Sequence, residues 1–207
     1  MYRIVDKKIL NPQITAMTVE APFVAKKVQP GQFVIIRADE KGERVPLTVA
    51  DFDREKGTVT VILQAIGFST KKISSFNVGE SLADCVGPLG VPTEFGSPKK
   101  AIVIGGGVGC AIAYPQAKAL HNMGVDTTVI AGFRSKDIVI LEEEMKAVSN
   151  NLYITTDDGS YGHKGFVTDV LKDLISKDTY DLVIAIGPIP MMKFVSKTTE
   201  EQNIKTI

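Results

Sequence analysis

The sequence of 207 residues predicts an antiparallel β-barrel followed by an α/β domain with a doubly wound parallel sheet. Three observations lead to this fold class. The first half holds short β-type runs separated by turns, the second half alternates strands with helical stretches, and the change falls near residues 95–98. We therefore expect one domain over residues 1–97 and a second over residues 98–207.

The first domain is expected to contain strands joined mainly by turns. Clusters such as Gln29–Gly31 and Asp53–Gly57 carry the Gly, Pro and Asp residues that favour turns. One short helix is expected over Thr70–Phe76. Many short strands with a single helix are typical of a small antiparallel barrel. The expected strands are Arg3–Leu10, Ile14–Glu20, Phe33–Arg37, Val45–Phe52, Thr58–Gln64 and Ser81–Val86.

The second domain follows a β-α-β rhythm, which predicts a parallel sheet with helices on both faces. The expected strands are Ala101–Ile104, Thr127–Ala131, Tyr153–Thr155 and Leu182–Ile186. The expected helices are Cys110–Met123, Leu141–Val148 and Val167–Ile175.

Composition is that of an ordinary globular protein. The chain has 24 basic and 24 acidic side chains, and 44% of its residues are hydrophobic, which suffices for two modest cores. The balanced charge gives no reason to expect nucleic acid as a partner. No run of about 18 apolar residues is present, and the first residues lack the apolar segment of a secretory signal, so we expect no membrane span and a cytoplasmic location.

The two cysteines, Cys85 and Cys110, lie in unrelated contexts. Two thiols this far apart provide neither a disulfide framework nor a metal site with C-x-x-C spacing. We expect both to be small buried side chains, and we expect no metal site in this chain.

A glycine-rich loop follows the first strand of the second domain. Such a loop exposes backbone N–H groups at a helix N-terminus, which suits a pyrophosphate. Gly105 and Gly107 match the first two positions of the G-x-G-x-x-G pattern, but the third falls on Cys110. A turn that binds nothing is the alternative. The candidate contacts are Gly105, Gly106, Gly107, Val108 and Gly109.

Five motifs occur in an order that resembles the ferredoxin-reductase superfamily. They are Arg44–Thr48, Gly67–Thr70, Gly87–Gly90, the glycine loop and Gly187–Met192. Within the superfamily, the chain most resembles the electron-transfer subunit of dihydroorotate dehydrogenase B. It is also similar to the sulfide dehydrogenase small subunit and to the FAD-carrying small subunit of NADH-dependent ferredoxin:NADP oxidoreductase. The resemblance covers essentially the whole chain.

The resemblance implies that the barrel binds FAD. Val45, Pro46, Leu47 and Thr48 would run beside the isoalloxazine, with Thr48 near its reactive nitrogen as the catalytic candidate; an edge strand with an exposed threonine is the alternative reading. The wider superfamily has an arginine where this chain has Val45. Arg44 is the nearest replacement for contact with the flavin pyrophosphate, but strand alternation would turn it to the face opposite Val45.

Two further segments of the barrel belong to the implied FAD site. The strand residues Leu63, Gln64 and Ala65 would run along the flavin. Gly67, Ser69 and Thr70 would receive the pyrophosphate at a helix N-terminus, although helix capping alone also favours Ser or Thr there. Gly87–Gly90 is expected to form a tight turn at the end of the barrel.

The second domain is implied to bind NAD(P)H. Arg134 and Ser135 follow the second strand and could accept a 2′-phosphate, but a similar arginine occurs in NADH-using relatives, so the choice stays open. Asp158 lies in a turn that faces the nucleotide in relatives, or that is simply a surface turn. Gly187, Pro188 and Met191 would wall the nicotinamide, with Ile186 where many superfamily members have a cysteine.

The implied function is electron transfer by a flavoprotein subunit, from NAD(P)H through FAD to a [2Fe-2S] cluster and a larger catalytic partner subunit. Two distant cysteines cannot replace four cluster ligands, so we expect the cluster only in a full-length protein. We expect truncation, because Ile204–Ile207 looks like the start of a strand; a member without a cluster is the other possibility. Rival functions are a freestanding NAD(P)H:flavin or flavodoxin reductase and a non-catalytic nucleotide-binding module.

Overall fold

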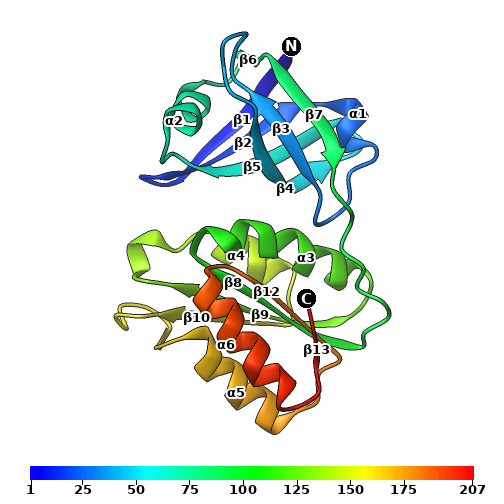
Figure 1. The fold of residues 1–207 in the computed structure, drawn as a ribbon, viewed down its shortest axis with the longest axis vertical. Coiled ribbons are helices and arrows are strands. Elements are labelled where there is room, and N and C mark those ends of the chain that lie inside the picture. Colours follow the sequence, from blue (N-terminus) through cyan, green and yellow to red (C-terminus); the bar gives the residue numbers. More distant parts are fainter. The chain divides into compact units, whose positions relative to one another are not determined.

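A computed structural model describes residues 1–207 and divides the chain into two compact units, Met1–Thr93 and Glu94–Ile207 (Figure 1). The first unit is built on an antiparallel sheet and the second on a parallel sheet with helices. The predicted fold class is thereby confirmed. None of the helices combines the length and the apolar composition needed to cross a membrane.

The first unit contains a seven-stranded antiparallel sheet in the order β6-β1-β2-β5-β4-β3-β7. Strands β6 and β7 lie at opposite ends of this order, yet only Ala83 separates them in the sequence. The sheet must therefore curl until its two edges meet, which makes a nearly closed barrel. The strands are β1 Tyr2–Asn11, β2 Ile14–Glu20, β3 Phe33–Arg37, β4 Val45–Asp53, β5 Thr58–Gln64, β6 Ser81–Leu82 and β7 Asp84–Leu89.

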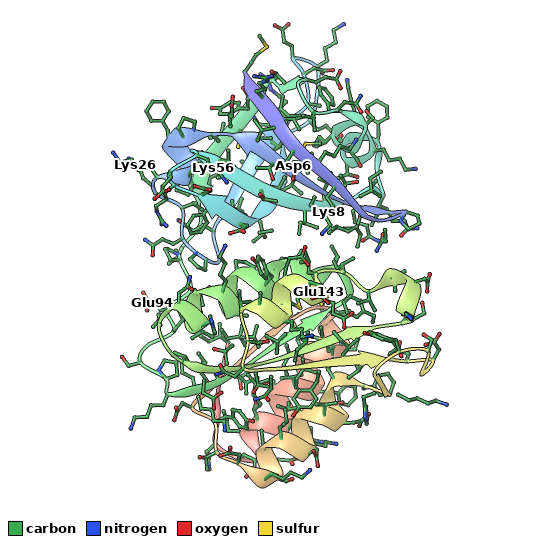
Figure 2. The ribbon with its side chains drawn as sticks, turned by 180° about the vertical axis from the view of Figure 1, so that it is seen from behind. Asp6, Lys8, Lys26, Lys56, Glu94 and Glu143 are labelled. Atoms are coloured by element: carbon green, nitrogen blue, oxygen red, sulfur yellow. The ribbon has the colours of Figure 1, made fainter.

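Alternation along the strands fills the interior of this barrel. In β5, Val59, Val61 and Leu63 are buried, while the residues between them are half-buried. On β1, a bulge between Ile4 and Asp6 breaks the alternation, so that Ile4 is buried whereas Asp6 and Lys8 project from the outer surface (Figure 2). The helices α1 (Pro22–Ala25) and α2 (Phe68–Ser75) complete the unit.

Two predictions for the barrel were wrong. The strand expected over Ser81–Val86 is two strands, and the turn expected over Gly87–Gly90 lies mostly within β7. Phe33 pairs with Leu89 and Ile35 with Val86, so three steps along β7 face two steps along β3. Such a bulge at the end of a sheet accommodates Gly and Pro inside a strand.

The second unit contains a six-stranded parallel sheet in the order β11-β10-β9-β8-β12-β13. In Figure 1, α3 and α4 cover one face and α5 and α6 the other, which is the doubly wound arrangement. The strands are β8 Lys100–Gly106, β9 Asp126–Phe133, β10 Asn151–Thr156, β11 His163–Lys164, β12 Leu182–Ile186 and β13 Lys205–Thr206. The helices are α3 Cys110–Asn122, α4 Glu142–Ala147, α5 Val167–Lys177 and α6 Ile189–Glu200, with short 3-10 turns η1 Gly107–Gly109 and η2 Lys136–Ile138.

Strand β8 is the centre of this unit. Its residues Ala101–Ile104 are fully buried because helices cover both faces of the sheet, as their continuous apolar run predicts. Burying one isoleucine side chain stabilises the fold by about 1.5–3 kcal/mol. The order of the strands reverses its direction between β8 and β12, and this switch point opens at the carboxyl ends of the strands.

Helix α6 was not predicted from the sequence. Pro188 caps this helix and Pro190 lies in its first turn, where proline is tolerated because that N–H has no helical partner. Pro188 and Pro190 favour a turn in a sequence-based interpretation, so the helix that follows them was not expected.

Candidate functional site

The glycine loop joins β8 to α3 through tight backbone contacts. A Cβ atom on Gly105 would lie 2.9 Å from Cys110 Cα, and one on Gly109 would lie 2.4 Å from the carbonyl oxygen of Ile186. Both distances are shorter than any normal contact. These two glycines are therefore needed for the fold itself, because α3 and β12 pack directly against the loop.

Gly107 differs from these two glycines. Its φ of 55° lies in the left-handed region, and a Cβ atom on it would meet nothing within 4 Å. The neighbouring Val108 is 38% exposed. Gly107 and Val108 thus form the open part of the loop, beside the N-terminus of α3, where an anionic group can approach the backbone.

The structure brings the last predicted motif against this loop. A Cβ on Gly106 would lie 2.6 Å from Met191 Sδ and 3.0 Å from Pro188 Cδ, and one on Gly187 would lie 3.1 Å from Gly106 Cα. Gly106, Gly187, Pro188 and Met191 therefore form one wall at the switch point between β8 and β12. Gly106 and Gly187 are 81 positions apart and meet here, as expected for the carboxyl ends of neighbouring strands.

Arg134, Ser135 and Asp158 also come together, at the ends of β9 and β10. The N–H of Asp158 donates to the carbonyl oxygen of Arg134 at 3.2 Å, and Arg134 is exposed. Ser135 Oγ donates to Asp137 Oδ1 at 2.5 Å. Asp158 Oδ1 accepts bonds from the hydroxyl and the N–H of Ser160, which lower the pKa of this carboxyl.

Beside Arg134, contacts that the sequence did not predict join η2, the start of α4 and the loop between β10 and β11. Lys136 N–H donates to Ser160 Oγ at 2.8 Å, and the Lys136 ammonium lies 5.1 Å from the centre of the Tyr161 ring. Tyr161 donates from its hydroxyl to Glu142 Oε1 at 2.7 Å, and this bond raises the pKa of Tyr161. The only sequence signal was an aromatic residue within a glycine-rich turn. Loop residues that look independent in the sequence are thus one connected platform.

In the barrel, strand β4 lies between β5 and β3 and pairs with each of them over only half of its length. Its second half pairs with β5, ending at Val49 opposite Val61, whereas Val45–Thr48 pair with β3. Beyond that point, Leu63 and Gln64 pair only with β2. The edge of β4 at Val45–Thr48 and the edge of β5 at Ile62–Gln64 therefore do not pair with each other, and no other strand pairs with them there. We call this feature the β4–β5 opening.

The predicted residues around the β4–β5 opening differ in how far their side chains are exposed. Val45, Leu47 and Thr48 are half-buried, Pro46 is exposed, and Arg44 is exposed just before β4. Leu63 points into the barrel core and is 2% exposed, so it offers only its backbone. Ala65 N–H already donates to the carbonyl oxygen of Gln13 at 2.8 Å.

The start of α2 lies directly after this edge. Gly67 is the N-cap, and its N–H donates to Oγ1 of Thr70, the third residue of the helix, at 3.1 Å. Ser69 Oγ donates to the carboxylate of Glu43. A pocket of about 210 Å³ opens here, and its lining includes Lys41, Glu43, Phe68, Ser69 and Lys72. A hydrogen bond from Lys72 lowers the pKa of Asp39 beside the pocket.

The chain is similar to several known proteins. Residues 103–197 match the family model of the oxidoreductase NAD-binding domain. An uncharacterized protein of Clostridium beijerinckii is 51% identical over 100% of this chain and 73% of its own length. A dihydroorotate dehydrogenase B (NAD(+)) electron transfer subunit homolog of Thermotoga maritima is 41% identical over 97% of this chain and 71% of its own length.

Solved structures show the same two-unit fold. A chain of the NADH-dependent reduced ferredoxin-NADP oxidoreductase, studied for flavin-based electron bifurcation, has a TM-score of 0.92 and 39% identity over 100% of this chain and 74% of that chain. The ferredoxin reductase of carbazole 1,9a-dioxygenase shares the fold at a TM-score of 0.78 and 19% identity, over 100% of this chain and 68% of that chain.

The fold and these relatives define the class as ferredoxin-reductase-like oxidoreductases. The resemblance stated from the motifs is thereby confirmed. Within this class, the chain belongs to the family of dihydroorotate dehydrogenase B electron transfer subunits.

The packing around the glycine loop predicts how it responds to substitution. Gly109→Ala should lower the free energy of unfolding by about 1–3 kcal/mol, because its Cβ overlaps a backbone oxygen that cannot move freely. Gly67→Ala is the control, since its Cβ would meet nothing within 4 Å; it should cost only about 0.5 kcal/mol through helix capping. Denaturant unfolding of both variants measures the difference, and equal midpoints would contradict the close contact with Ile186.

Burial of the thiols predicts their reactivity. Both cysteines are buried, as expected, and burial raises the pKa of Cys85 to about 12 and that of Cys110 to about 12. Each thiol therefore stays protonated at pH 8 and should react with a disulfide reagent more than roughly 10³-fold slower in the native protein than after unfolding. A burst of one or two equivalents from the folded protein would show that a thiol is accessible.

Proposed function

We propose that this chain is the FAD-carrying subunit of an NADH-linked electron-transfer complex. FAD would bind in the first unit, NADH in the second, and electrons would leave to a larger catalytic partner subunit. The proposal draws on relatives that are named electron transfer subunits and on a structural neighbour named for NADH and ferredoxin. A cytoplasmic location belongs to the same proposal.

The observation that carries the FAD assignment is the β4–β5 opening. Backbone N–H and C=O groups buried without partners are costly, so native proteins satisfy them. The edges of Val45–Thr48 and Ile62–Gln64 carry backbone groups that no neighbouring strand pairs, at mostly half-buried positions. These groups could pair with a flat, polar ring, and the isoalloxazine carries matching acceptors and donors along one edge. Thr48 would add a hydroxyl beside the reactive side of the ring.

The adjoining helix fits the rest of FAD. Gly67, Ser69 and Thr70 form the first turn of α2, whose N–H groups suit a pyrophosphate, and Lys41 and Lys72 line the pocket there. Arg44 is exposed at the beginning of β4 and supplies a further positive charge. The donor set thus fits a dinucleotide whose ring lies along the strands.

NADH would bind across the carboxyl ends of the parallel strands. Gly107 and Val108 present the open backbone for its pyrophosphate, while Gly106, Gly187, Pro188 and Met191 form a wall for the nicotinamide. Bound FAD supplies the chemistry, accepting a hydride and releasing electrons singly. The residues of this chain orient the two ligands and keep water from them.

The partner and the cluster lie outside what residues 1–207 provide. A [2Fe-2S] cluster needs four ligands, and the chain has only two cysteines, both buried. We therefore place any such cluster on segments or subunits other than these residues. The proposed acceptor of the electrons is the larger partner subunit.

An absorbance spectrum tests the proposal directly. The purified protein, incubated with FAD and freed of excess, should show flavin bands that bleach when NADH is added anaerobically. A protein that stays colourless contradicts the proposal and favours a nucleotide-binding module without redox chemistry. Turnover with soluble acceptors should be slow without the partner, whereas rapid turnover would favour a freestanding reductase.

The charges near Arg134 predict a preference for NADH over NADPH. Ser135 and Ser160 already donate their hydroxyls to Asp137 and Asp158, so a 2′-phosphate beside Arg134 would have to compete with two carboxylates for these donors. NADH should therefore reduce the bound flavin at lower concentrations than NADPH. The ratio of the NADPH concentration to the NADH concentration needed for half-reduction of the flavin should fall by about tenfold in Asp137→Asn. Asp173→Asn on α5 should leave this ratio unchanged. Tighter binding of NADPH than of NADH by the unaltered protein would refute this preference.

A further inference from the structure

One acidic side chain lies at the start of α2. Glu43 lies two residues before β4, and its carboxylate accepts the hydrogen bond of Ser69 Oγ in the first turn of α2. Helices leave their first N–H groups without partners inside the helix, and the resulting partial positive charge stabilises a nearby anion. The carboxylate of Glu43 therefore acts here as a bound anion would.

This inference rests on the proposed function, in which the same helix end receives the pyrophosphate of FAD. The hydroxyl of Ser69 has a single hydrogen and can donate it to one acceptor at a time. Glu43 and a phosphate oxygen therefore compete for that donor. Their like charges also repel at this range, so both cannot hold the position together.

The surroundings allow Glu43 to leave without moving the loop that carries it. Asp39 pairs with Lys72 on α2, and Asp39 Oδ1 accepts the N–H of Lys41 at 3.1 Å. Gly42 N–H donates to the carbonyl oxygen of Asp39 at 3.0 Å. The loop before Glu43 is thus anchored at Asp39, while Glu43 itself is exposed.

Displacement of Glu43 also changes the charge of the pocket. Lys41 and Lys72 line the same pocket of about 210 Å³, and Glu43 is the acidic residue among the lining side chains. Once its carboxylate turns away, the pocket keeps Lys41, Lys72, which Asp39 also pairs, and the first N–H groups of α2. The exchange favours a ligand with two phosphate charges over a single carboxylate.

We propose that Glu43 is an internal competitor for the flavin phosphate site, which occupies the start of α2 when FAD is absent and is displaced when FAD binds. It stabilises the protein without flavin and lowers the affinity for FAD. The chain thereby sets how readily the flavin can be exchanged.

The test compares FAD binding by Glu43→Gln and by the unaltered protein. Glutamine keeps the shape and one acceptor oxygen but removes the charge. The dissociation constant, measured by quenching of flavin fluorescence, should fall about 3- to 10-fold, and the gain should shrink at about 1 M salt. Glu40→Gln on the same loop is the matched control and should bind FAD within about twofold of the unaltered protein.

A second measurement separates this role from a general effect on stability. Without FAD, Glu43→Gln should melt at a lower temperature than the unaltered protein, because it loses the charge at the helix end, so stability and affinity should change in opposite directions. Equal or weaker FAD binding by Glu43→Gln overturns the proposal while leaving the proposed function standing. Absence of FAD binding in the unaltered protein overturns both.

Discussion

The change of partner along β4 is the constraint on which the first unit depends. A strand that paired with β5 along its whole length would close the barrel wall and satisfy every backbone group. Instead, the ladder with β5 ends at Val49 and Val61, and the first half of β4 is paired only along its other edge, with β3. The barrel remains stable because the side chains of core residues such as Met17 and Leu63 point to the inner face, even where the backbone, as at Leu63, belongs to an unpaired edge.

In the second unit, packing against neighbouring elements holds a glycine-rich segment in one conformation. Strand β8 is buried on both faces, and its end is pressed between Cys110 on one side and β12 on the other. Gly107 and Val108 are the residues of the loop that remain open to solvent. The result is a loop in which the positions that build the fold and the positions open to a ligand are different residues.

The fold class and most element positions could be predicted from the sequence because both depend on local periodicity. Strands such as Phe33–Arg37 and Leu182–Ile186 begin and end as expected, since each alternates or runs apolar between turn residues. Gly87–Gly90 was misjudged because a bulge depends on register with β3, which no local pattern encodes. Helix α6 was not predicted because Pro188 and Pro190 are equally typical of a turn and of the first residues of a helix.

The candidate site was predictable only as a set of segments. The motifs named the strands and loops, but no sequence signal paired Tyr161 with Glu142, or Ser69 with Glu43, because these contacts join segments 19 and 26 residues apart in the chain. Asp158 was chosen for its turn, whereas its actual contact is the hydroxyl of Ser160. Side-chain pairing across loops requires the tertiary fold.

The contact between Gly109 and the carbonyl of Ile186 has a consequence for protein engineering. It sets the spacing of two main chains with no side chain between them, so insertions or deletions in the glycine segment would shift the whole switch point. Redesign for another nucleotide is better directed at the platform of Lys136, Ser160 and Tyr161. The side chains of Ser160 and Tyr161 bond to other segments at the surface, and the Lys136 ammonium lies over the Tyr161 ring, so all three can be exchanged without displacing a strand.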